Sequence, residues 1–151
     1  MSNLSEQQIN SYKENGYVSP IDILSPQEAK EVREEIEIIE NKCPDILEGI
    51  GRNYVHIISP IFNKICLNNR MLDAVESIIG KNILICGTTL FIKNANEKEF
   101  VSFHQDAKYI GLEPHNWVNA WIAITDSKEK QGWMRMGPGS HKSNIRYNNK
   151  K

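Results

Sequence analysis

The sequence predicts an α+β chain that is helical in its first part and β-rich in its second. Apolar residues recur at helical spacing up to Gly80, and from Asn82 the period changes and β-branched and aromatic residues dominate. The chain has 151 residues, 40% hydrophobic and 25% charged, which is the composition of one globular domain. We therefore divide it into helical residues 1–80, β-rich residues 81–141 and a polar tail, 142–151.

Two helices are predicted near the N-terminus. Ser5 opens a capping-box pattern, and Gly16 supplies the C-terminal stop of the first helix. Ser25 caps a second helix that begins at Pro26 and must end before Pro44. The acidic residues of the second helix fall mostly on its outer face, where solvation explains them better than metal binding does.

Two further helices precede the β-rich part. One begins at Pro60, and the other runs from Arg70 to a stop at Gly80. Residues 82–93 then read as a strand.

On this predicted strand, Lys93 shares a face with Thr89 and Gly87. Threonine and glycine among large neighbours suit the wall of a cavity, although a simple thinning of the sheet at Gly87 explains them equally well.

The segment 117–125 predicts a second strand with two different faces. The apolar face carries Val118, Ala120, Ile122 and Ile124. The mixed face carries Asn119, Trp121, Ala123 and Thr125. A mixed face is expected where a sheet lines a pocket, but on pattern alone Trp121 is equally well an aromatic that fills core space.

Composition excludes several classes of partner. The formal net charge is −1 and no basic face is clustered, so no nucleic-acid interface is predicted. No signal segment and no apolar run of membrane-spanning length occurs, so we expect a cytoplasmic protein without membrane contact. Cys43, Cys66 and Cys86 are irregularly spaced and indicate neither a disulfide framework nor a zinc knuckle.

His104-Gln105-Asp106 is the most informative motif of the chain. The motif lies in a segment, residues 100–104, that reads as a strand. Alternate strand residues point to one face, so His104 and Asp106 can bind one metal ion while Gln105 points away. An imidazole and a carboxylate are two of the three ligands in the 2-His-1-carboxylate sites of non-heme Fe(II) oxygenases. By itself the tripeptide is a weak signal, because most such pairs only form a hydrogen bond at the surface.

Three other histidines are the candidates for a third ligand: His56, His115 and His141. Each has a plain alternative as a polar residue beside a strand or helix or in a loop. A histidine without a partner that orients its ring is usually not a ligand, so the plain alternatives are favoured.

Motifs with a characteristic order and spacing extend over nearly the whole chain. In the second part they are Phe91-Ile92-Lys93, residues 100–112 with the His-X-Asp motif, residues 118–124, and residues 132–142 with Pro-Gly-Ser-His. In the first part they are residues 4–9, 15–20 and 24–29. In this arrangement the chain resembles the phytanoyl-CoA dioxygenase family, over the first part of that family's domain.

The resemblance implies a fold and a reaction. The fold is a double-stranded β-helix, a jelly-roll (cupin-like) barrel of about eight strands, with the N-terminal helices packed on its first strands. The reaction is hydroxylation of a small organic substrate with dioxygen, Fe(II) and 2-oxoglutarate, with His104 and Asp106 as iron ligands. Trp121 matches the family's tryptophan that contacts 2-oxoglutarate, and Lys93 and Thr89 are the further candidates for binding it.

The same resemblance implies hydroxylation rather than halogenation, and an incomplete site. Asp106 retains the carboxylate that halogenating relatives replace.

His141 and Arg146 mimic in compressed form the family's distal histidine and 2-oxoglutarate-binding arginine, but the Pro-Gly-Ser-His loop is a separate element in similar sequences. His141 is therefore not predicted as a ligand, and we expect a dioxygenase fragment that turns over poorly alone. Trp133 and Tyr54 depart from the family's usual cysteine and basic residue, which affects pocket shape.

Two alternatives stay open. The chain is expected to hold only about half of the barrel's strands. It could therefore be a non-catalytic half-barrel that dimerises or docks on a partner, since strand edges without a neighbouring strand favour self-association. It could also be a small cupin-like metal enzyme that uses His56 or His141 as its third ligand.

Overall fold

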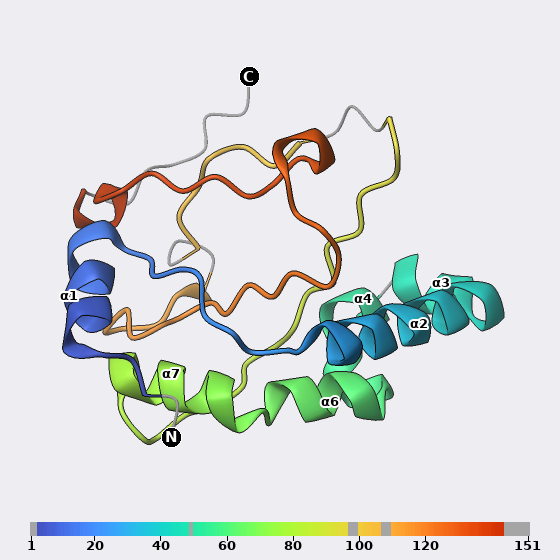
Figure 1. Cartoon of the computed structure of the whole chain (residues 1–151), viewed down its shortest axis with the longest axis horizontal. Coiled ribbons are helices and arrows are strands. Elements are labelled where there is room, and N and C mark those ends of the chain that lie inside the picture. The colour runs from blue at the N-terminus through green and yellow to red at the C-terminus, as the bar shows by residue number, and fades with distance from the viewer. Residues whose placement is uncertain (1–2, 49, 97–99, 107–109, 144–151) are drawn as a thin grey trace.

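Helices occupy the first half of the structure, a computed structural model that describes residues 3–48, 50–96, 100–106 and 110–143. They are α1 (Glu6–Asn15), α2 (Pro26–Lys42), α3 (Pro44–Glu48), α4 (Ile50–Asn53), α5 (Val55–Ile58), α6 (Pro60–Cys66) and α7 (Asn69–Ile79). Two 3-10 turns, η1 (Glu129–Gln131) and η2 (Ser140–Lys142), lie in the second half. Figure 1 shows α1 beside η2 at one end of the molecule and α2 with α3 at the other.

The caps expected from the sequence are present and set the helix ends. Ser5 and Gln8 form a reciprocal capping box at α1, and Gly16 ends this helix with φ +83°. Ser25 forms the same motif with Glu28 at α2. The four predicted helices are thus confirmed, whereas α3, α4 and α5 were missed because helices of four or five residues are too short to show a period.

The hydrophobic core lies within the helical half. Its buried members are Val32, Ile36, Leu47, Val55, Phe62 and Leu90. The second half contributes Leu90, and Ile92 and Ile124 pack against the cluster. Cys66 of α6 is also buried, and this burial raises the pKa of its thiol, which favours the protonated form.

No β-strand occurs among residues 81–96, 100–106 and 110–143. The strands predicted over 82–93, 100–104 and 117–125 are therefore wrong for the described residues, and the β-helix stays an expectation from the resemblance. The physical reason is that β-propensity measures how side chains fit a pleated surface, whereas a strand also requires a neighbouring strand to complete its hydrogen-bond ladder. Here the second half forms wide loops of extended chain beside the helices (Figure 1).

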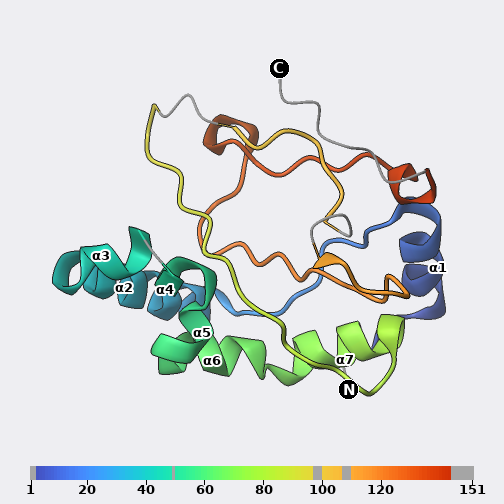
Figure 2. The same cartoon turned by 180° about the vertical axis from the view of Figure 1, so that it is seen from behind.

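Part of the predicted first strand is held by the helices instead. The backbone N–H groups of Thr88 and Leu90 donate to the carbonyl oxygens of Asn53 and Arg52. In return the Arg52 guanidinium donates to the carbonyl oxygen of Leu90 at 2.8 Å. Figure 2 shows this segment running back from α7 toward α4. The helices thereby replace a partner strand and direct Leu90 into the core.

The alternation of side chains predicted for both extended segments is retained. Thr89 and Lys93 are exposed, whereas Leu90 is buried. In the later segment, Asn119 and Trp121 are exposed and the apolar face is largely half-buried. Extended backbone alone imposes this period of two, with or without a ladder.

The helices of the described part include none with the length and apolar character required to cross a lipid bilayer.

Candidate metal centre

His104 and Asp106 face each other across Gln105. His104 Nε2 lies 3.1 Å from Asp106 Oδ1, and the two side chains are 32% and 43% exposed. Gln105 points elsewhere, and its amide donates to the carbonyl oxygen of Ser140 at 3.0 Å. The structure therefore brings together the two residues that the alternation placed on one face.

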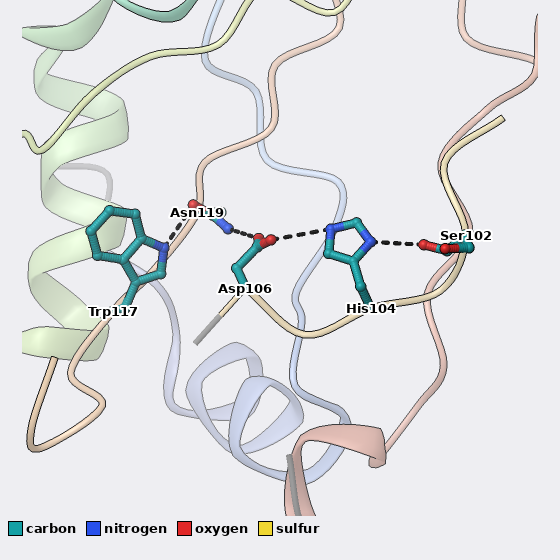
Figure 3. A network of polar contacts seen from close by, with 5 residues as sticks. All are labelled: Ser102, His104, Asp106, Trp117 and Asn119. Atoms are coloured by element: carbon teal, nitrogen blue, oxygen red, sulfur yellow. Dashed lines mark hydrogen bonds and ion pairs between the residues drawn. The ribbon is translucent and has the colours of Figure 1, made fainter. Parts of the chain in front are cut away.

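Ser102 fixes the orientation of the His104 ring. His104 Nδ1 lies 2.7 Å from the carbonyl oxygen of Ser102 (Figure 3). A carbonyl oxygen only accepts, so Nδ1 carries the hydrogen and donates it. Nε2, the other ring nitrogen, faces Asp106. A histidine held in this way from behind is the usual form of a metal-binding imidazole.

Asn119 holds Asp106 from its other side. The Asn119 side-chain amide donates to Asp106 Oδ2, and the Trp117 indole N–H donates to Asn119 Oδ1 at 2.8 Å. Figure 3 shows the resulting row from Trp117 through Asn119, Asp106 and His104 to Ser102. We did not predict Asn119 as a site residue, although its place on the mixed face of 117–125 was a signal for it.

Nε2 and Oδ1 are close enough to form an ion pair when His104 is protonated, and close enough for both to bind one metal ion. The observed separation is 3.1 Å. Imidazole with carboxylate is a donor set suited to Fe(II).

Sequence comparison identifies the family of the chain. The profile described as phytanoyl-CoA dioxygenase (PhyH) matches residues 12–151. The chain belongs to the phytanoyl-CoA dioxygenase family. This family implies a cupin-like fold.

Relatives of this phytanoyl-CoA dioxygenase family chain are distant. It is 24% identical to ectoine dioxygenase of Bordetella bronchiseptica over 94% of this chain and 51% of that protein. It is 22% identical to ectoine dioxygenase of Halomonas elongata over 92% and 46% of the two chains. A phytanoyl-CoA dioxygenase domain-containing protein 1 homolog of Dictyostelium discoideum is 28% identical over 60% of this chain and 32% of that protein.

The phytanoyl-CoA dioxygenase family chain spans about half the length of the ectoine dioxygenases that it matches, 51% and 46%. No solved structure matches it.

The three histidines considered as third ligands lie in other settings. His56 Nδ1 is 2.8 Å from Thr88 Oγ1, and His141 Nε2 donates to the carbonyl oxygen of Lys13. His115 is exposed. Within residues 3–48, 50–96, 100–106 and 110–143, no group of three or more His, Cys, Asp or Glu side chains gathers around a common point. Arg146 lies outside the described residues.

The residues expected to contact 2-oxoglutarate have their polar contacts elsewhere. Lys93 Nζ donates to the carbonyl oxygen of Gly132 at 3.1 Å, and Thr89 Oγ1 donates to Asn53 Oδ1 at 3.4 Å. Trp121 is 47% exposed and lies two residues after Asn119 on the same side of the extended segment. The described contacts thus bring together His104, Asp106 and Asn119, but neither Lys93 nor Thr89 with them.

Proposed function

We propose that this chain carries the His-X-Asp part of an Fe(II)- and 2-oxoglutarate-dependent hydroxylase acting on a small organic substrate with dioxygen. The observation that carries the proposal is the pairing of His104 Nε2 with Asp106 Oδ1 at 3.1 Å, with Nδ1 engaged from behind by Ser102. Membership of the phytanoyl-CoA dioxygenase family supports the same reaction class.

Each residue of the pair has a distinct role in this proposal. His104 would donate its Nε2 lone pair to iron, and Asp106 would contribute one oxygen and a negative charge that offsets part of the ion's charge. Bound iron supplies the capacity to activate dioxygen together with 2-oxoglutarate. Trp121 would line the co-substrate site, and the Lys93 ammonium, with Thr89, would attract a carboxylate group of 2-oxoglutarate.

Anaerobic titration of the chain with Fe(II) tests the ligand assignment. We expect one site whose affinity falls by more than about 100-fold in His104→Ala and in Asp106→Ala, because losing even an outer partner of a ligand costs about 10–100-fold. His115→Ala is the matched control, since this exposed histidine lies outside the pair. Equal affinities in wild type and His104→Ala would contradict the assignment, and a loss in His141→Ala or His56→Ala would favour the cupin-like alternative.

Turnover is measured separately, as succinate formed from 2-oxoglutarate in the presence of Fe(II) and oxygen. We expect succinate above background from the wild-type chain, and none above background from Asp106→Ala. Succinate formation that does not depend on Asp106 would contradict the proposed reaction.

The exposure of large apolar side chains around the metal motif favours one second candidate. Phe100, Val101 and Phe103 are 81%, 62% and 70% exposed. Apolar side chains gathered on a surface are typical of protein interfaces. The second candidate is therefore a non-catalytic module that pairs with a second copy of this chain through these residues.

Mass measurement by light scattering distinguishes this second candidate. Self-association predicts a dimer that Phe103→Ser weakens, whereas Ile57→Ser, a 73% exposed position on α5, leaves the dimer intact. A monomer at all concentrations would exclude this candidate and leave the hydroxylase proposal standing.

A further inference from the structure

The orientation of the Asn119 side chain follows from its two neighbours. An indole N–H only donates, so the atom of Asn119 that meets Trp117 Nε1 at 2.8 Å is the carbonyl oxygen. An ionised carboxylate only accepts, so the atom that meets Asp106 Oδ2 is the amide nitrogen. Both contacts require the same orientation of the amide. If the amide were reversed, its NH2 group would face the indole N–H and its oxygen would face the carboxylate.

This orientation gives the two oxygens of Asp106 different surroundings. Oδ2 accepts the hydrogen bond from Asn119, whereas Oδ1 faces His104 Nε2 at 3.1 Å. A carboxylate that rotated freely could offer both oxygens to an ion. Here the Asn119 amide donates to Oδ2, which weakens this oxygen as a ligand, and leaves Oδ1 beside His104 Nε2.

We propose that Asn119, held by Trp117, is a positioning residue that keeps Asp106 a one-oxygen metal ligand. This inference rests on the proposed function, because it assigns a role toward the ion that His104 and Asp106 would hold. It also explains how a half-exposed pair keeps its geometry: Ser102 fixes the imidazole and Asn119 fixes the carboxylate, so neither ligand depends on burial for its orientation.

A one-oxygen aspartate has a consequence for coordination. It occupies one position on the ion and leaves more positions for exogenous ligands than a two-oxygen aspartate does. The arrangement therefore favours an ion with open sites, which metal-dependent oxygenation requires. Loss of the Asn119 amide would free Oδ2 to bind the ion as well.

The test loads the wild-type chain and its variants with Co(II), a stable substitute for Fe(II). We expect Asn119→Ala to lower Co(II) affinity by about 10–100-fold, the usual cost of losing an outer partner of a ligand. Trp117→Phe keeps the aromatic bulk, removes the N–H donor, and should lower affinity less. In the Asn119→Ala background, Trp117→Phe should have no further effect, because it acts through Asn119. Trp133→Phe is the control, at another half-exposed tryptophan.

Infrared spectra of the carboxylate provide a readout that a merely structural role would not change. On Co(II) binding, the wild-type chain should show the widely separated antisymmetric and symmetric stretches of a one-oxygen carboxylate. Asn119→Ala should show the narrower separation of a two-oxygen carboxylate. Asp106→Ala identifies the bands that belong to this residue, and Trp117→Phe serves as the second variant if Asn119→Ala does not fold.

The outcomes separate this inference from the proposed function. Co(II) binding that Asn119→Ala and Trp117→Phe leave unchanged in affinity and in carboxylate bands would overturn the inference alone. A folded wild-type chain that binds no Co(II), or binds it independently of Asp106, would overturn the proposed function and the inference with it. Loss of affinity together with narrowed bands in Asn119→Ala would support both.

Discussion

Gly16 and His141, 125 positions apart in the sequence, meet at the C-terminal end of α1. A Cβ at Gly16 would lie 2.5 Å from His141 Nδ1, and the backbone there has φ +83°. His141 Nε2 donates to the carbonyl oxygen of Lys13 at 3.1 Å, and the Gly139 N–H donates to that of Asn15 at 2.9 Å. The Pro-Gly-Ser-His loop thus satisfies carbonyl groups that every helix leaves unpaired at its end. His141 is therefore hydrogen-bonded to the end of α1 and not to the His104–Asp106 pair.

A side chain at position 16 should therefore lower the free energy of unfolding by more than the left-handed backbone conformation alone would. We expect Gly16→Ala to lower the free energy of unfolding by about 1–2 kcal/mol for the left-handed conformation, and further because His141 must move. In a His141→Ala background only the conformational part should remain. Chemical denaturation of the two single variants and the double variant measures this difference, and strict additivity would show that the contact does not contribute.

The His104-Gln105-Asp106 motif contacts the same loop. Gln105 donates to the carbonyl oxygen of Ser140, next to His141. We expect Gln105→Ala to lower stability only slightly, because the hydrogen bond is exposed, and to leave the Fe(II) binding proposed for His104 and Asp106 unchanged. Unfolding curves and Fe(II) titration measure the two effects independently, and loss of metal binding with unchanged stability would instead place Gln105 at the site.

At the scale of elements, the two capping boxes have the same geometry but different chemistry. Gln8 completes the box of α1, whereas Glu28 completes that of α2. The backbone hydrogen bond from Ser25, followed by that from its side chain, lowers the pKa of Glu28 below its ordinary value of 4.5. The box of α2 is therefore sensitive to pH and the box of α1 is not.

The sign of this pH effect follows from the lowered pKa. Stability contributed by ionised Glu28 is fully present above about pH 4.5 and is lost as pH falls through the lower pKa of the folded state. We expect Glu28→Gln to reduce the loss of thermal stability between neutral and acidic pH. Ser5→Ala should lower stability by about 1 kcal/mol equally at both pH values. Melting curves across this range test the contrast, and an unchanged acid dependence in Glu28→Gln would contradict it.

At the scale of the whole molecule, Leu90 connects the extended second half to the helical core. It is 7% exposed and belongs to the same buried cluster as Val32 and Phe62. Leu84, six residues earlier in the same segment, is 90% exposed. The two leucines thus form a matched pair in one extended stretch.

We expect Leu90→Ala to lower the free energy of unfolding by about 2–5 kcal/mol, the cost of a large-to-small substitution in a core. Leu84→Ala should change it by less than about 0.5 kcal/mol. Chemical denaturation measures both. Equal effects would mean that the second half does not contribute to the core as the structure has it.

The sequence by itself determined what depends on neighbouring residues. Ser5, Gly16 and Ser25 set helix ends because caps act within one turn, and His104 faces Asp106 because the two residues are only two positions apart. It also determined the family, because motif order is a property of the chain itself.

Only the tertiary structure decided which distant groups meet. Asn119 reaches Asp106 across thirteen positions, and His141 reaches α1 across more than a hundred. The residues predicted as strands run as extended chain because a ladder requires a second strand, and in the described part Thr88 and Leu90 pair with the helices instead. Local propensity specifies the conformation of a segment, whereas its partners are chosen by long-range packing and hydrogen bonding that no local pattern encodes.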